Sequence, residues 1–181
     1  MPVVRGKQIR VLFDELTIST RISVIAEEVA AQDHHDLLVV SILKGSFVFA
    51  ADLIRALHEA GLAPDVEFLS LSSYGEGTES SGTVRVVRDI DSDVAGRDVL
   101  LIDDILESGR TASFARKMMV ERGARTVRMA VLLDKAEKRA VPFEADFIGF
   151  PCPDYFVIGY GMDVAHAFRE LPYVGIVEDE E

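Results

Sequence analysis

An apolar strand that runs into two carboxylates and a small-residue turn is the part of this sequence best suited to chemistry. It spans residues 99–111 and reads VLLIDDILESGRT. Ser108, Gly109 and Thr111 can present hydroxyls and backbone N–H groups at a helix N-terminus, where the partial positive charge favours a phosphate monoester. Asp103 and Asp104 come just before this cradle and would lie near the sugar of the same ligand. Because adjacent residues of a strand point to opposite faces, a turn must begin at these acids if both serve one ligand.

An acidic pair at a strand end is, taken alone, equally typical of a solvent-facing loop. The residues that follow, Glu107 to Thr111, favour a binding site instead. Two further segments have polar residues at the end of an apolar run: Leu43-Lys44-Gly45-Ser46 and Leu133-Asp134-Lys135. Gly45 would let the backbone approach an anion closely. Lys44 and Lys135 could each also be an ordinary surface lysine.

These segments need elements that bring them together, and the apolar pattern supplies them. Apolar runs at 37–43, 66–71, 97–102 and 127–133 predict strands, and helical stripes are expected at 18–29, after Ser19 as a cap, at 47–57 and at 108–122. Alternation of continuous apolar strands with helices predicts an α/β fold with a largely parallel sheet flanked by helices. Ligands bind such sheets at the carboxyl ends of the strands, which is where the polar segments fall.

The 99–111 segment resembles the phosphoribosyl pyrophosphate motif of the type I phosphoribosyltransferase family, and the order of the other segments resembles its hypoxanthine branch. The resemblance covers about residues 18–177. It implies that Asp103 and Asp104 meet the ribose hydroxyls, and that the loop of Ser108, Gly109, Arg110 and Thr111 binds the 5-phosphate. The main chain of Lys44 and Gly45 would face pyrophosphate, with the Leu43–Lys44 peptide in the cis form.

The same resemblance identifies an acceptor site. Lys135 would donate a hydrogen bond to the 6-oxo oxygen of a purine. The 6-amino group of adenine is itself a donor and could not accept that hydrogen bond. In the run PDYFVIGYGMD, residues 153–163, Phe156 would stack on the base, the Val157 main chain would read its edge, and Asp163 would help to hold Mg²⁺. Asp103 and Asp104 are further candidate metal ligands, and Arg169 would contact pyrophosphate. An aromatic residue in such an apolar run is, taken alone, more often part of the core than a ligand platform.

The polar stretch 72–82 is too long for a tight turn and resembles the family's flexible catalytic lid, placed at about 72–86. Ser73 and Tyr74 would close over the reacting centre, because water there would hydrolyse an oxocarbenium-like ribosyl group. The resemblance further implies one phosphoribosyltransferase domain over residues 1–181, with a small hood built from the N- and C-terminal segments. Its expected reaction is purine salvage, the transfer of the 5-phosphoribosyl group to N9 of hypoxanthine and guanine with release of pyrophosphate.

Two positions depart from the family pattern. Glu107 stands where the family's acid–base group beside purine N7 is usually Asp, so the carboxylate reaches one methylene further. Asp103 stands where this branch often has Glu. We expect Glu107 to be the catalytic acid–base group, and the preference among hypoxanthine, guanine and xanthine stays open.

Composition excludes other classes of function. The net charge of −12 argues against a nucleic-acid or anionic membrane surface, and it disfavours the RNA-binding uracil-pathway regulators that share this kind of motif. Cys152 is the single cysteine, which precludes an internal disulfide. No apolar run reaches membrane-spanning length, so we expect a cytoplasmic protein with no membrane partner. The family further implies a homodimer or homotetramer.

Overall fold

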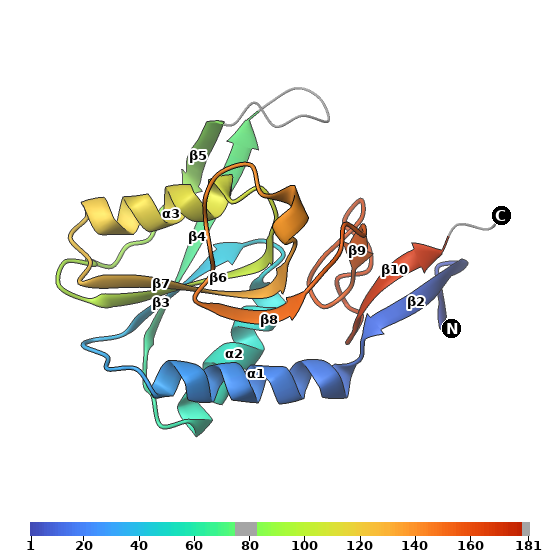
Figure 1. Cartoon of the computed structure of the whole chain (residues 1–181), viewed down its shortest axis with the longest axis horizontal. Helices are drawn as coiled ribbons and strands as arrows, with labels where there is room; N and C mark the ends of the chain where they lie inside the picture. Colours follow the sequence, from blue (N-terminus) through green and yellow to red (C-terminus); the bar gives the residue numbers. More distant parts are fainter. Residues whose placement is uncertain (75–82, 179–181) are drawn as a thin grey trace.

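The computed structural model describes residues 1–74 and 83–178 and contains a large central sheet with helices on both faces (Figure 1). The six-stranded sheet has the order β5-β4-β3-β6-β7-β8. Only the β4–β5 pair is antiparallel among its described neighbours, and the other four pairs are parallel. The prediction of an α/β fold with a largely parallel sheet is therefore confirmed. Its strands are β3 (Leu38–Leu43), β4 (Asp65–Tyr74), β5 (Thr83–Arg88), β6 (Asp98–Leu106), β7 (Thr126–Asp134) and β8 (Phe147–Pro151).

The central strands are apolar throughout because both faces of the sheet are covered. Leu100 and Ile102 belong to the core beneath helices α1 (Glu15–Ala30) and α2 (Phe47–Glu59). Val99 and Leu101, which alternate with them in β6, pack in a second core against α3 (Arg110–Glu121). Two buried faces therefore explain the continuous apolar pattern of the sequence.

The predicted start of the first helix was wrong. Asp14 caps α1, and its carboxylate accepts a hydrogen bond from the Thr17 N–H at 2.8 Å. Ser19 lies inside the helix, where its hydroxyl donates to the Leu16 carbonyl. A serine one turn into a helix can return its hydroxyl to the backbone in this way, so its presence does not mark a helix start.

The chain termini form a second, four-stranded sheet of order β1-β2-β10-β9, to one side of the large sheet (Figure 1). β2 pairs antiparallel with β10 at the other end of the sequence, and β10 pairs with β9. The strands are β1 (Val3–Val4), β2 (Lys7–Phe13), β9 (Val157–Ile158) and β10 (Val174–Glu178). This sheet brings the segment around residues 156–163 against the carboxyl ends of the central strands.

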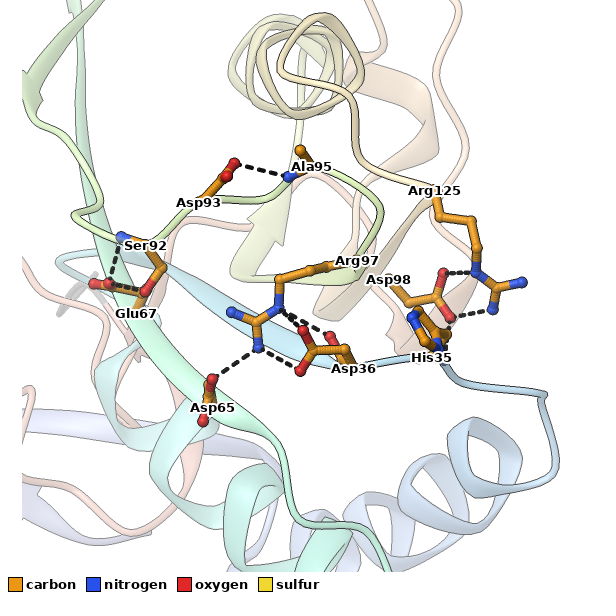
Figure 2. A network of polar contacts seen from close by, with 10 residues as sticks. All are labelled: His35, Asp36, Asp65, Glu67, Ser92, Asp93, Ala95, Arg97, Asp98 and Arg125. Carbon is orange, nitrogen blue, oxygen red and sulfur yellow. Dashed lines mark hydrogen bonds and ion pairs between the residues drawn. The ribbon is translucent and has the colours of Figure 1, made fainter.

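Ion pairs tie the opposite, amino ends of the central strands together (Figure 2). Arg97 bridges Asp36 and Asp65, at 3.0 and 2.8 Å. Asp98 is 1% exposed and accepts from Arg125, from the Thr126 hydroxyl and from the His35 N–H. Burial opposes ionisation of Asp98, but these hydrogen bonds outweigh it and lower its pKa to about 2. The network thus stabilises the amino ends of the central strands, whereas the polar segments lie at the carboxyl ends.

No helix of the described residues is long and apolar enough to cross a membrane.

Candidate active site

Two adjoining cavities lie at the carboxyl ends of β3, β6 and β7. The first, of about 520 Å³, is lined by Asp103 and Asp104, by Ser73 of β4, and by the loop from Glu107 to Ala112. The second, of about 530 Å³, is lined by Lys135, Phe156, Val157, Asp163 and Arg169. Lys44, Gly45, Asp104 and Glu107 line both cavities and form their shared wall. A ligand that bridges this wall would touch both halves of the site.

The phosphate-type cradle is made where β6 gives way to α3. Gly109 adopts the left-handed conformation, with φ of 81°, and α3 begins at the next residue without a side-chain cap. The Ser108 hydroxyl accepts from the Arg110 N–H at 3.3 Å. Because the first N–H groups of a helix lack partners within it, the first turn of α3, which lines the first cavity, is suited to an anion.

From the sequence, a turn was expected to begin at Asp103 and Asp104 if both acids serve one ligand. In the structure both acids lie within β6. β6 continues to Leu106, and Asp103, Ile105 and Leu106 still pair with β7. The Asp103 carboxylate accepts from the Asp104 N–H, and the Asp104 carboxylate accepts from the Ile105 N–H, each at 2.9 Å. Both acids line the first cavity although the strand is unbroken. Burial, and then the charge of Asp104, raise the pKa of Asp103 well above its usual value.

Two glycines allow close approaches at the shared wall, one to a side chain and one to the backbone. A Cβ atom on Gly45 would lie 1.8 Å from Asp104 Oδ2. A Cβ atom on Gly161, which has a φ of 95°, would lie 2.4 Å from the Gly45 carbonyl oxygen. The Leu43–Lys44 peptide beside them is cis, which confirms the expectation drawn from the resemblance. Sequence reasoning identified Gly45 but missed Gly161, whose only signal was a second glycine in GYG.

Lys135 is not a surface lysine. Its side chain is 5% exposed, and its ammonium contacts Glu107 Oε1 at 2.6 Å. Glu107 is half exposed and is the first residue after β6. Its carboxylate therefore pairs with the lysine that follows the neighbouring strand, β7.

The second cavity also receives an aromatic side chain and an acid–arginine pair. Phe156 is 68% exposed, which excludes the core position that its apolar neighbours suggest, while Val157 is buried in β9. Arg169 contacts Asp163 Oδ1 at 2.8 Å and donates to the Gly161 carbonyl at 2.6 Å. Asp163 Oδ2 accepts from the His166 N–H at 2.7 Å. An exposed aromatic ring and a fixed ion pair thus flank the same space.

The structure brings together nearly all the residues that the sequence singled out. Ser73 and Tyr74 end β4, with Ser73 at the first cavity, but the Tyr74 side chain and residues 75–82 of the expected lid lie outside what is described. Among the described residues, no three His, Cys, Asp or Glu side chains are grouped to hold a metal alone. Mg²⁺ commonly takes one or two carboxylates and completes its shell with water and substrate phosphates, so the paired acids fit it as partial ligands.

Comparisons with known proteins agree with this geometry. A family model described as the phosphoribosyl transferase domain matches residues 13–165. The chain is 41% identical over 181 residues to a hypoxanthine-guanine phosphoribosyltransferase of Aquifex aeolicus, with 99% of this chain and 100% of that protein covered. It is 41% identical to the enzyme of the same name from Dictyostelium discoideum, with 94% and 96% covered.

The fold has a solved counterpart as well. A hypoxanthine phosphoribosyltransferase of Trypanosoma cruzi, solved in complex with the product IMP, superposes with a TM-score of 0.88 and 35% identity, and the match covers 98% of each chain. A family model over most of the chain and full-length relatives at this identity establish the relationship. The chain therefore belongs to the phosphoribosyltransferase family, in its hypoxanthine-guanine branch.

Proposed function

We propose that this protein transfers the 5-phosphoribosyl group of phosphoribosyl pyrophosphate to N9 of hypoxanthine and of guanine, giving IMP or GMP and pyrophosphate. This is a reaction of purine salvage. The observation that carries the proposal is the pair of adjoining cavities, one with a phosphate cradle and the other with an aromatic ring and a buried ammonium. The shared wall of Lys44, Gly45, Asp104 and Glu107 is where the two substrates would meet.

The first cavity would take the donor. Ser108 to Thr111 would hold the 5-phosphate at the start of α3, supported by the absence of a side-chain cap there. Asp103 and Asp104 would accept hydrogen bonds from the ribose hydroxyls. The pyrophosphate of the donor would extend across the shared wall into the second cavity, where the main chain at Lys44 and Gly45, together with Arg169, would face it beside Asp163.

The second cavity would take the purine. Phe156 would stack on the base, and its 68% exposure leaves the ring face accessible. The Val157 main chain would read the edge of the base, and Lys135 would donate to the 6-oxo group. Glu107 would exchange the proton at N7 as the general acid–base group. The N7 and O6 atoms of a purine are neighbours, as the Glu107 carboxylate and the Lys135 ammonium are here.

Asp103, Asp104 and Asp163 would supply oxygen ligands to Mg²⁺ brought in with the donor. Burial, and then the nearby charge of Asp104, raise the pKa of Asp103, and a cation bound beside these two carboxylates would relieve their repulsion. When bound, Mg²⁺ would screen the pyrophosphate charge. The residues around it bind and orient the donor.

Closure and assembly complete the proposal. We infer a single domain over residues 1–181, in which the terminal sheet acts as the hood and residues 72–86 act as the lid, with Ser73 and Tyr74 over the reacting centre. The protein would work in the cytoplasm as a homodimer or homotetramer, with small-molecule substrates and no nucleic-acid or membrane partner.

The test is the formation of IMP from hypoxanthine and phosphoribosyl pyrophosphate by the purified protein. We expect turnover with Mg²⁺, loss of activity when a chelator is added in excess, and recovery when Mg²⁺ is restored. Undiminished turnover in metal-free buffer would contradict the donor assignment and the metal role of the three aspartates.

A further inference from the structure

Arg139 lies between the two loops that carry the proposed catalytic and base-reading residues. It follows the short 3₁₀ helix η1 (Ala136–Lys138), and its side chain is 16% exposed. Its Nη1 donates to the carbonyls of Leu106 and Glu107, and its Nε donates to the Phe143 carbonyl at 3.0 Å. Its Nη2 pairs with the Asp134 carboxylate. One guanidinium thus joins the ends of two neighbouring strands to the loop that follows them.

These contacts fall where the sheet no longer fixes the backbone. Leu106 is the last residue of β6 and Asp134 the last of β7, so Glu107 and Lys135 are the first residues beyond the paired strands. The Lys135 N–H donates to the Leu106 carbonyl at 2.9 Å. The N–H groups of Ala140 and Val141 donate to the Ser108 carbonyl at 2.9 and 3.1 Å. Segment 135–143 is therefore joined to the start of the phosphate cradle.

Packing at this junction is close as well as polar. A Cβ atom on Gly109 would lie 3.1 Å from Arg139 Cδ and 3.1 Å from Phe143 Cβ. Gly109, the left-handed residue just before α3, therefore packs against the aliphatic part of the Arg139 side chain. Arginine suits the position because its planar group offers several N–H donors at fixed angles, whereas lysine offers one compact ammonium.

We propose that Arg139 is a positioning residue for the transfer reaction, which sets Glu107 relative to Lys135 without touching the substrate. This inference rests on the proposed function. Arg139 holds the Glu107 backbone through its carbonyl and holds the residue before Lys135 through the Asp134 carboxylate. A proton can be exchanged with N7 only from within hydrogen-bond reach, and a shift of about 1 Å at a catalytic group can cost on the order of 100-fold in rate.

The decisive variants are Arg139→Ala and Arg139→Lys. We expect Arg139→Ala to lower kcat by about 10- to 100-fold while the dissociation constant for phosphoribosyl pyrophosphate changes less than about threefold. Arg139→Lys should recover little of the loss, because one ammonium cannot reach the three carbonyls and the carboxylate together. Added guanidinium ion, at concentrations that leave the wild type folded, should raise kcat of the alanine variant and leave the wild type unchanged.

Arg97→Ala is the matched control. Arg97 is 12% exposed, pairs with Asp36 and Asp65 at 3.0 and 2.8 Å, and donates to the Asp36 carbonyl at 3.1 Å. Those partners lie at the opposite, amino ends of the central strands, so kcat should stay near the wild-type value. Wild-type kcat in Arg139→Ala would overturn the proposal. An equal loss of kcat in both variants, with no response to guanidinium, would overturn it too, because the loss would then follow general stability.

Hydrogen exchange separates this inference from the proposed function. In Arg139→Ala the amides of Lys135, Ala140 and Val141, which donate to Leu106 and Ser108, should exchange at least about tenfold faster, whereas those in the middle of β7 should not change. This readout needs no substrate. If the wild type made no IMP but exchange rose in Arg139→Ala, the proposed function would be wrong and the role of Arg139 in holding these loops together would still be supported. If exchange did not change in Arg139→Ala, that role of Arg139 would be contradicted.

Discussion

The contact of Glu107 with Lys135 joins the two side chains that we propose to bind neighbouring atoms of the purine, N7 and O6. The Lys135 ammonium, which is almost fully buried, pairs at 2.6 Å with the Glu107 carboxylate, which is half exposed. An incoming 6-oxopurine would replace this contact with two of its own, at O6 and at N7. The Glu107 carboxylate, which is one methylene longer than an aspartate would be, is the partner of the buried Lys135 ammonium in this chain.

Replacement of Glu107 by Gln tests the acid–base role. The variant keeps the side-chain length and a carbonyl oxygen that can accept from Lys135, so the buried ammonium keeps a partner. We expect kcat to fall by roughly 10²- to 10⁴-fold, as for a lost general acid–base group, with little change in donor binding. Glu107→Asp should retain much of the activity. Near-normal kcat in the Gln variant would mean that another group or water handles the proton.

Replacement of Lys135 by Ala tests base recognition. Lys135 lines the second cavity and the donor cradle lies in the first, so the KM for hypoxanthine should rise by roughly 10-fold or more while the donor dissociation constant barely moves. Lys138→Ala is the control, because Lys138 is about half exposed and pairs with Asp154 outside the cavity. Equal losses for donor and base in Lys135→Ala would show that the lysine has a structural role.

At the scale of the elements, the site depends on how closely the ends of β3 and β6 approach. Gly45→Ala would place a methyl group on the Asp104 carboxylate, since the Cβ would lie 1.8 Å from its Oδ2. A side chain can turn away, so we expect a change in melting temperature of only a few degrees. The displaced acid should nevertheless cost roughly 10-fold or more in kcat/KM for the donor. A full-activity variant would show that the Asp104 position is not required.

The apolar runs predicted β3, β4, β6 and β7 and the three helices, because strands covered on both faces must be apolar throughout. The prediction failed where local chemistry was ambiguous. Asp103 and Asp104 are typical of a turn, yet β6 continues to Leu106 because its backbone still pairs with β7. The pairing of β2 with β10 joins opposite ends of the chain, which no local pattern encodes.

The site itself was predictable to the extent that its residues lie in contiguous motifs. Gly161 and Arg139 act through contacts with segments distant in sequence, the Gly45 carbonyl in one case and the end of β6 in the other. Arg139 also sits in a charged run, 134–139, that is typical of a solvated loop. Its low exposure becomes apparent only when the loop folds back on Leu106 and Glu107.

For the whole molecule, Asp98 at the amino end of β6, opposite the active site, makes a pH-dependent contribution to stability. The folded-state pKa of Asp98, about 2, lies below its ordinary value of 3.8, so the folded form binds fewer protons. This stability is present above about pH 4 and is lost as pH falls through about 2, and the shift corresponds to about 2 kcal/mol. Asp98→Asn should lower the free energy of unfolding at pH 7 by about that amount and should approach the wild type near pH 2.

Urea unfolding at pH 7, 4 and 2 measures this dependence. Asp89→Asn is the control, because Asp89 pairs with Arg122 on the surface and its pKa is also lowered, chiefly by that hydrogen bond. Exposed ion pairs contribute less to stability than buried ones, so Asp89→Asn should lower the free energy of unfolding at pH 7 by less than Asp98→Asn does. A difference between wild type and Asp98→Asn that did not narrow toward pH 2 would mean that the variant acts through packing and not through charge.

The proposed transfer of the phosphoribosyl group from phosphoribosyl pyrophosphate to 6-oxopurines, with release of pyrophosphate, is tested most directly by one competition measurement. The wild-type protein is incubated with Mg²⁺, the donor and equal concentrations of hypoxanthine, guanine, xanthine, adenine and uracil, and the nucleotide products are resolved by mass. The buried Lys135 ammonium predicts that the main products are nucleotides of the 6-oxopurines, with AMP and UMP at least about 100-fold lower. A predominance of AMP or UMP, or the absence of any nucleotide, would contradict the account.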